Sequence, residues 1–360
     1  MKILDTIGAD KITITNFDII SIDTDKFKRL VGKEYIILGD PEEGRNIFDN
    51  RTSLPISLVN LRFPKVPKDK ENDNFLLNFL FTGFKNGMES SLRLNLPKVL
   101  HGNNILNITN GECFMECLDK AKEKLFNDYG IEINFNNAHF KEIEINKTLT
   151  LDKPFNEYKQ ALGFIHNCIK FKQTTRRGLY HIGDNFSGID FKNKEMQLKF
   201  YDKALEQGIE ELGNNMLRVE LTLITNQKIL NSLGISSVEE LKDNYYVLED
   251  YFNKFTERFV KQPTLKGIEE HRKFIAKELK EQQKANSRGF WQKAIIRIGE
   301  IYDFEMFKEE VCKCISKVNK ARTCKTLDKF KDDILKDNKK NVCLGNSDAF
   351  TNVLELINKL

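Results

Sequence analysis

One short stretch, KFYDKALE at residues 199–206, contains a tyrosine with a lysine on each side. Lys199 lies two residues before Tyr201, and Lys203 lies two residues after it. A phenol has an ordinary pKa of about 10, so it is a weak nucleophile at neutral pH unless nearby positive charge favours the phenolate. The stretch is therefore either an ordinary half-buried strand or a phenolic nucleophile with cations beside it.

Alternation along a strand decides which polar groups can meet, because successive side chains point to opposite faces. The segments FKEIEIN at 140–146, EMQLKFYDKALE at 195–206 and MLRVELTLI at 216–224 are predicted strands with one apolar face each. Their other faces carry Glu142, Glu144, Asn146, Lys199, Tyr201, Lys203, Arg218, Glu220 and Thr222. If the strands are neighbours, these groups share one face.

Carboxylates, basic groups and a tyrosine on one face are the parts of a metal-assisted phosphoryl transfer. Mg²⁺ and Mn²⁺ take oxygen ligands, which Glu144 and Glu220 are expected to supply. Positive charge from the cation, Lys203 or Arg218 is expected to favour the phenolate of Tyr201. The same residues also fit an exposed sheet face with ordinary cross-strand pairs, and alternation alone does not show that the strands are adjacent.

The chain of 360 residues exceeds the usual size of one domain, about 100–200 residues, so two domains are expected. Up to about residue 225 the pattern is mostly of strands, with helices predicted at 111–130 and 155–171. Beyond it, Lys/Glu-rich amphipathic stretches predict helices. We therefore predict an α+β domain in residues 1–225 and a helical C-terminal domain in residues 226–360, which binds DNA or a partner.

The formal net charge is only +4, so a nucleic-acid partner must meet a local basic surface. Residues 251–300 carry 12 Lys or Arg against 6 Asp or Glu and are the candidate surface. The residues expected there to contact DNA phosphates are Arg272, Lys273, Lys277, Arg288 and Lys293. A solvated helical face is the alternative. No apolar run reaches the ~20 residues of a membrane helix and no secretory signal is visible, so we expect a cytoplasmic protein.

Four short motifs occur in a fixed order: LNLPKVLHGNNI at 94–105, EIEIN at 142–146, LYHIGDNFSGIDFKNKEMQLKFYDKALEQ at 179–207 and LRVEL at 217–221. This order resembles the gene II replication initiators of filamentous phages and the related rolling-circle initiators of plasmids. In that family a PxKVLxGxN-like segment precedes an Arg-hydrophobic-acid strand, a Tyr-x-Lys strand ending in Glu, and an Arg-hydrophobic-Glu strand. The matching positions are Lys98, Gly102, Asn103, Glu144, Tyr201, Lys203, Glu206, Arg218 and Glu220.

The resemblance implies a rolling-circle replication initiator whose residues 1–225 form a nicking and joining domain with a central antiparallel sheet and flanking helices. Tyr201 would attack a DNA phosphodiester, remain joined to the 5′ end as a phosphotyrosine and leave a free 3′-OH. Lys203 and Arg218 would assist it, and Lys98 and Asn103 would contact DNA. The implied partner is origin DNA, single-stranded or supercoiled. Whether the protein also binds a host helicase or a second copy of the chain is left open.

The chain departs from the family pattern at the metal site. The family strand acid is usually Asp after Arg, whereas Glu142 precedes Glu144 here, so the resemblance implies either or both as ligands beside Glu220. Many rolling-circle nucleases use a His-hydrophobic-His pair, which is absent from the five histidines at 101, 139, 166, 181 and 271. The expected Mg²⁺ or Mn²⁺ site is therefore acid-rich, and its third ligand is unidentified.

Three alternatives remain open. A non-catalytic regulator of replication on the same scaffold would bind the origin without cleaving it. Tyr180 is the rival nucleophile to Tyr201. A tyrosine recombinase would need a tyrosine near the C-terminus among several Arg and His residues, and the last tyrosine, Tyr302, lacks them.

Overall fold

The structure is a computed structural model. It describes residues 6–23, 26, 36–38, 59–62, 76–84, 87–171, 174–182, 185–207, 215–282, 324–325, 327–329 and 349–360. Of the predicted DNA contacts, Arg288 and Lys293 lie outside these residues, and Lys277 is described by its backbone alone.

The described strands form one large antiparallel sheet and one small one. The large sheet has ten strands in the order β3-β4-β5-β6-β1-β8-β12-β11-β10-β9. Their bounds are β1 Ile7–Thr15, β3 Ile36–Leu38, β4 Val59–Arg62, β5 Leu76–Phe84, β6 Gly87–Asn95, β8 His139–Thr150, β9 Arg176–Ile182, β10 Asn185–Lys192, β11 Met196–Asp202 and β12 Met216–Leu223. The small sheet pairs β2 (Asp18–Ile22) with β7 (Ile131–Asn134).

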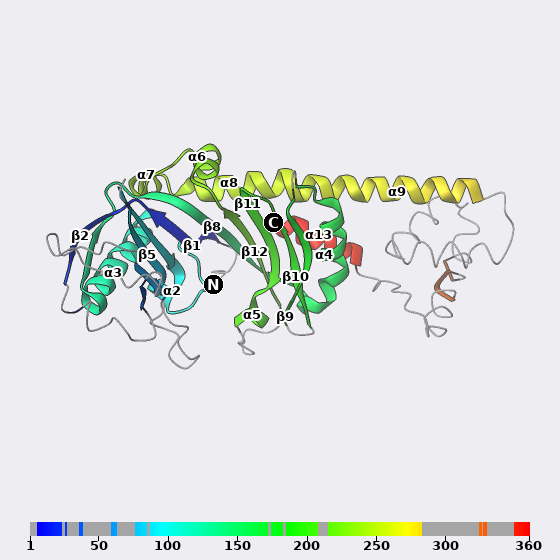
Figure 1. Cartoon of the computed structure of the whole chain (residues 1–360). Helices are drawn as coiled ribbons and strands as arrows, with labels where there is room; N and C mark the ends of the chain where they lie inside the picture. The colour runs from blue at the N-terminus through cyan, green and yellow to red at the C-terminus, as the bar shows by residue number, and fades with distance from the viewer. Residues whose placement is uncertain are drawn as a thin grey trace.

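Helices flank this sheet (Figure 1). They are α2 (Leu96–His101), α3 (Gly111–Tyr129), the 3-10 turn η3 (Phe155–Tyr158), α4 (Lys159–Cys168), α5 (Lys203–Gln207), α6 (Asn226–Leu233), α7 (Val238–Asp243), α8 (Tyr246–Thr256), the π-helical turn η5 (Glu257–Lys261), α9 (Gln262–Gln282) and α13 (Ala349–Lys359). In Figure 1, α9 continues the line of α8 and extends beyond the sheet, and α4 and α13 lie beside each other near β9 and β10. The predicted α+β fold with a central antiparallel sheet is confirmed.

Caps explain where the first predicted helix begins and ends. The side chain of Asn110 accepts a hydrogen bond from the backbone N–H of Cys113 and so caps the N-terminus of α3. Gly130 ends the helix in the left-handed region at φ 69°, which favours glycine. The second predicted helix divides into η3 and α4 and ends at Cys168, before its predicted end at residue 171.

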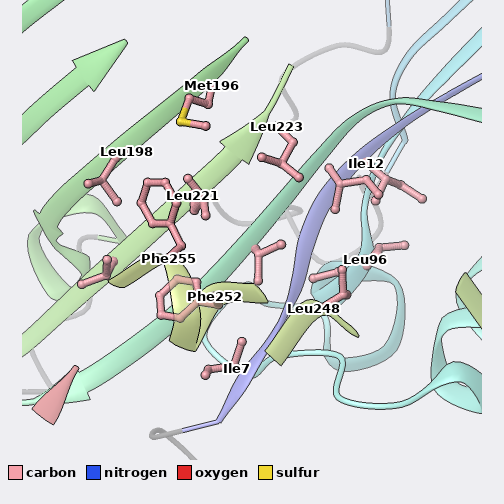
Figure 2. Packing of buried hydrophobic residues seen from close by; sticks show 14 of the residues in the cluster. Ile7, Ile12, Leu96, Met196, Leu198, Leu221, Leu223, Leu248, Phe252 and Phe255 are labelled. Atoms are coloured by element: carbon pink, nitrogen blue, oxygen red, sulfur yellow. The ribbon is translucent and has the colours of Figure 1, made fainter. Parts of the chain in front are cut away.

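The main core lies on the apolar face of the sheet, under α8. Leu221 and Leu223 of β12 lie in one buried cluster with Leu248, Phe252 and Phe255 of α8 (Figure 2). Burial of such a side chain contributes about 1.5–3 kcal/mol, so this face anchors α8 firmly. The side chains of alternate residues therefore point to the opposite face of β12, away from α8.

Helices from beyond the predicted domain boundary contribute to this core together with the strands that precede it. Ile229 of α6 and Leu356 of α13 belong to the same buried cluster as the strands. The division into domains at residue 225 stays a prediction. Among the described helices, none is both long enough and apolar enough to cross a membrane.

The strand that holds Tyr201 ends earlier than predicted. We expected it to continue through Lys203, but β11 ends at Asp202. The carboxylate of Asp202 accepts a hydrogen bond from the backbone N–H of Leu205, 3.0 Å away, and caps the short helix α5. Lys203 therefore begins a helix, and strand alternation does not determine its direction.

Candidate active site

The predicted strands are neighbours, because β8, β12 and β11 are consecutive in the sheet. In their register, Tyr201 faces Arg218, Lys199 faces Glu220, and Glu220 in turn faces Asn146. The predicted polar face is therefore shared. It is also buried: the side chains of Glu144 and Glu220 are only 3% and 1% exposed. The alternative of an exposed face with ordinary cross-strand pairs is wrong for these residues.

A bulge in β1 adds a third carboxylate to this face. Ala9 pairs with Ile145 and Ile12 pairs with Ile143, so Asp10 and Lys11 together oppose the single residue Glu144. Strict alternation would place the side chains of Asp10 and Lys11 on opposite faces of the sheet. The bulge changes their directions, so that both reach the polar face. One carboxylate oxygen each of Asp10, Glu144 and Glu220 lies within 4.8 Å of the others, as a possible metal-binding group.

Asp10 and Lys11 were missed in the sequence, although a signal for them exists. In IGADKITIT the apolar residues Ala9, Ile12 and Ile14 change their spacing from three to two, which is how a bulge interrupts alternation. The two polar residues inside that gap are the ones that reach the site. We call Asp10, Glu144 and Glu220 the acid triad.

Each carboxylate of the acid triad contacts one basic side chain. Lys11 Nζ lies 2.9 Å from Glu144 Oε1, and Lys199 Nζ lies 2.5 Å from Glu220 Oε1. Arg218 Nη1 donates to Asp10 Oδ2 at 3.0 Å, and both of these side chains are fully buried. With all three carboxylates ionised, the three basic groups balance their charge.

Arg218 also attaches the motif segment that follows α2 to the sheet. Its Nε donates to Thr148 Oγ1 at 2.9 Å, and its Nη2 donates to the carbonyl of Ile105 at 3.0 Å. All three nitrogens of the guanidinium group therefore have a partner, and Arg218 holds Asp10 in a fixed position. This is the position of an orienting residue, since the group is not accessible to a phosphate.

Burial and mutual repulsion act on the acids. Burial, then the neighbouring carboxylate of Glu220, raises the pKa of Glu144 well above its ordinary value. Burial also opposes ionisation of Glu220, but the ammonium groups of Lys11 and Lys199 outweigh it and lower the pKa of Glu220 to about 2. We infer that the pair retains one proton, held on Glu144, until another cation enters.

Tyr201 lies directly on this group. Its hydroxyl donates to Glu220 Oε2 at 3.0 Å, and the residue is only 5% exposed. Burial, then the charge of Glu220 and Glu206, raises the pKa of Tyr201 well above its ordinary value, against the opposing effect of Arg218. Arg218 acts in the expected direction, but without a metal ion it does not offset the effect of burial on the pKa of Tyr201.

Lys203 lies beside the tyrosine without touching its hydroxyl. Its Nζ is 5.7 Å from the centroid of the Tyr201 ring and 2.5 Å from Glu206 Oε2. Burial, then repulsion by Arg218, lowers the pKa of Lys203 to about 8. The side chain is fully buried, so it stabilises the surroundings of the ring and does not face solvent.

Several buried polar atoms at the site have no hydrogen-bond partner within the described part of the chain. They are Asp10 Oδ1 and both side-chain atoms of Asn146, the residue opposite Glu220. An unsatisfied buried polar group costs about 1–3 kcal/mol, so such atoms call for a ligand or water. Hard divalent cations take carboxylate and amide oxygens, and the acid triad beside Asn146 fits Mg²⁺ or Mn²⁺.

The remaining predicted ligand, Glu142, is not part of the acid triad. Glu142 Oε1 is instead paired with Arg93 Nη2 at 2.9 Å, near the exposed part of the same face. The rival nucleophile Tyr180 is on β9 and pairs with Gly188 of β10, and Gly188 pairs on its other side with Tyr201 of β11. The side chain of Tyr180 lies outside the described part of the structure.

The predicted DNA contacts lie away from the acid triad or have local roles. Asn103 Oδ1 accepts from the N–H of Ile105, and its Nδ2 donates to the carbonyl of His101, so this side chain shapes the turn after α2. Lys98 is half-buried in α2. Arg272 and Lys273 lie on α9, half-buried and exposed respectively, and α9 continues from α8 on the opposite face of the sheet (Figure 1).

Comparisons with known proteins find a similar solved structure but no match by sequence. No protein-family model and no curated protein matches the sequence. The chain is similar to the structure of a rolling circle replication initiator protein from Geobacillus stearothermophilus, with a TM-score of 0.31 and 10% identity over 66% of this chain and 79% of that one. Similarity at this level gives no support to a function, which must be inferred from the side chains.

Proposed function

We propose that this protein is a rolling-circle replication initiator that nicks and rejoins DNA with Mg²⁺ or Mn²⁺ and with Tyr201 as its nucleophile. The observation that carries the proposal is the hydrogen bond from the Tyr201 hydroxyl to Glu220, a member of a buried triad of carboxylates in which Asp10 Oδ1 has no partner within the described part of the chain. A phenol beside a cation site has the groups that attack on a phosphodiester requires.

In the proposed reaction the phenolic oxygen attacks phosphorus and forms an O–P bond while the bond from phosphorus to the 3′ oxygen breaks. The phenolic proton passes to Glu220 Oε2, its acceptor at 3.0 Å. The leaving 3′ oxygen takes up a proton from water, and Glu220 returns its proton to the solvent, so the step has no net change in protons. The products are a 5′-phosphotyrosine and a free 3′-OH, and attack by a 3′-OH reverses the step and rejoins the strand.

The resting site resists this transfer, because the pKa of Tyr201 is raised and that of Glu220 is about 2. Asp10, Glu144 and Glu220 would hold the divalent cation, with Asn146 beside them. When bound, the cation supplies positive charge that polarises the phosphate and lowers the pKa of the phenol. Arg218 keeps Asp10 oriented throughout, since its own bonds do not involve the reacting atoms.

The test uses a randomised pool of single-stranded DNA, since the nick site is unknown. The protein is incubated with the pool and Mn²⁺, denatured, and examined for DNA joined covalently to it. We expect an adduct that requires the metal and disappears in Tyr201→Phe but persists in Tyr180→Phe. An adduct formed by Tyr201→Phe would show that another residue is the nucleophile.

A second candidate, the non-catalytic origin-binding regulator, is favoured by one observation. Each carboxylate of the acid triad already contacts a basic side chain of the protein, and a charge-balanced group needs no metal. This candidate predicts DNA binding that weakens with salt, no measurable Mn²⁺ binding and no adduct. Calorimetric titration with Mn²⁺ separates the two functions before any DNA substrate is known.

A further inference from the structure

Two lysines lie between the acid triad and solvent. Lys11 and Lys199 contact Glu144 and Glu220, which are almost fully buried, yet their own side chains are 23% and 28% exposed. The basic groups that the resemblance assigns to the reaction of Tyr201, Lys203 and Arg218, are fully buried. Among these four basic side chains, only Lys11 and Lys199 are open to an approaching DNA strand.

The polar face is open on the side where these lysines lie. Along β8, the side chain of Glu142 is 22% exposed, whereas Asn146 and Thr148 further along are fully buried. The carbonyl of Asn146 accepts a hydrogen bond from Asn107 Nδ2, which belongs to the segment after α2 that covers this end. A phosphate must therefore reach the acid triad from the side of Lys11 and Lys199.

We propose that Lys11 and Lys199 bind the phosphate of the DNA strand, and that they become available to it only when a divalent cation replaces them on Glu144 and Glu220. The inference rests on the proposed function for its substrate. Without the cation, Lys199 is the counter-ion of the Glu220 carboxylate, and Lys11 lies against the carboxyl group of Glu144. With the cation on the carboxylates, both ammonium groups turn to the non-bridging oxygens of the phosphodiester.

Charge and side-chain chemistry support this exchange of partners. The ionised acid triad is balanced by Lys11, Lys199 and Arg218, so a divalent cation leaves two excess positive charges that attract an anion. A lysine carries a compact charge on a flexible four-carbon stem, so its ammonium group can move to a new partner while its backbone remains in the sheet. Lysine is also an established ligand for phosphate as a point charge.

The experiment measures DNA affinity against salt for Lys11→Gln, Lys199→Gln and the wild type, each with and without Mn²⁺. Oligothymidylate is the probe, because it measures phosphate contacts without a specific nick site. Lys147→Gln is the matched control: Lys147 lies on β8, between β1 and β12 in the same sheet, but its Nζ donates to the carbonyl of Lys359, away from the acid triad. The two site variants are independent tests, so either is sufficient if the other does not fold.

We expect each site variant to lower the slope of log affinity against log salt by about 0.7 when Mn²⁺ is present, and to leave the slope unchanged without it. Each site variant also removes an ammonium group that competes with Mn²⁺ for a carboxylate. Mn²⁺ should therefore bind about tenfold more tightly to both site variants, and not to Lys147→Gln. An unchanged slope with Mn²⁺ would mean that the lysines are structural counter-ions, and an equal loss with and without Mn²⁺ would exclude their release by the metal.

Failure of this inference is distinguishable from failure of the proposed function, because no step of the test requires cleavage. A wild-type protein with the metal-dependent lysine contacts but no covalent adduct would overturn the nicking reaction alone. A metal-dependent adduct with unchanged slopes in both variants would overturn the role of the lysines alone.

Discussion

Two buried tyrosines of this protein donate to glutamates, and their surroundings differ. Tyr201 donates to Glu220 at 3.0 Å on the sheet, and Tyr158 donates to Glu355 of α13 at 2.5 Å. Burial raises the pKa of both phenols, with a further contribution from the glutamate in each case. The hydroxyl–carboxylate contact is therefore not what distinguishes a reactive site from a structural one.

The difference lies in what surrounds each glutamate. Glu355 Oε1 accepts from Lys359 Nζ at 2.7 Å and from the N–H of Asp152 at 3.1 Å, which attaches α13 to the segment after β8. Around Glu220, by contrast, buried atoms of Asp10 and Asn146 have no partner within the described chain. A network that the chain satisfies by itself holds an element in position, whereas one with unpartnered buried oxygens is suited to a ligand.

The strongest test of this comparison is to remove each hydroxyl in turn. Tyr201→Phe should reduce formation of the covalent DNA adduct by about 10⁴-fold or more, since the attacking oxygen is lost. Tyr158→Phe should retain the adduct and lower the free energy of unfolding by about 1.5–3 kcal/mol, the usual contribution of a hydrogen bond to a charged group. Adduct assays and urea unfolding of both variants measure this, and equal adduct loss in the two would remove the distinction.

Neutralising one carboxylate in each network should separate metal binding from stability. Loss of a residue that only contacts a metal ligand weakens metal binding by roughly 10–100-fold. Glu144→Gln removes a carboxylate of the acid triad itself, so it should weaken Mn²⁺ binding by at least that much. Its stability should change little, because Gln resembles the protonated acid that the raised pKa of Glu144 favours. Glu355→Gln should leave Mn²⁺ binding unchanged in calorimetry, and a comparable loss there would mean that the acid triad is not the metal site.

The raised pKa of Glu144 predicts an unusual dependence of stability on pH. Above its ordinary pKa of 4.5, the unfolded chain has lost a proton that the metal-free folded protein keeps, so stability falls as the pH rises towards the folded pKa. Glu220, with a pKa of about 2, is ionised throughout this range and adds no slope.

Urea unfolding at pH 5 and pH 8, with chelator or with Mn²⁺, measures this dependence. We expect the wild type with chelator to have a lower free energy of unfolding at pH 8 than at pH 5. We expect no such decrease in the wild type with Mn²⁺ or in Glu144→Gln. A metal-free wild type that loses no more stability between these values than Glu144→Gln does would contradict a proton held on Glu144.

The smallest expected effects come from two buried asparagines. Asn352 of α13 donates to the carbonyl of Glu157 at 3.0 Å, so Asn352→Ala should cost about 1–3 kcal/mol. The amide of Asn146 has no described partner, so Asn146→Ala should cost less without metal but weaken Mn²⁺ binding several-fold. Denaturation and titration of both variants measure this, and a larger cost at Asn146 would show that its amide is already satisfied.

Much of the site was predictable because alternation is visible in single segments. The strands β8, β11 and β12 and the common face of Glu144, Tyr201 and Glu220 follow from apolar residues at every second position. The adjacency of the strands did not follow, since any partner strand would satisfy the same alternation. The secondary structure at Lys203 was predicted incorrectly because Asp202 caps a helix that begins there, although Lys203 Nζ still lies beside the Tyr201 ring.

The sequence by itself determined which residues of each strand face the same way, because a period of two is a property of neighbours along the chain. Only the tertiary structure decided that Asp10 joins Glu144 and Glu220, that Lys11 and Lys199 separate them from solvent, and that this polar face is buried. Arg218 and Asp10 are 208 positions apart, and their contact depends on strand order and on a bulge between paired strands. Those pairings are made between distant segments, so no local pattern contains them.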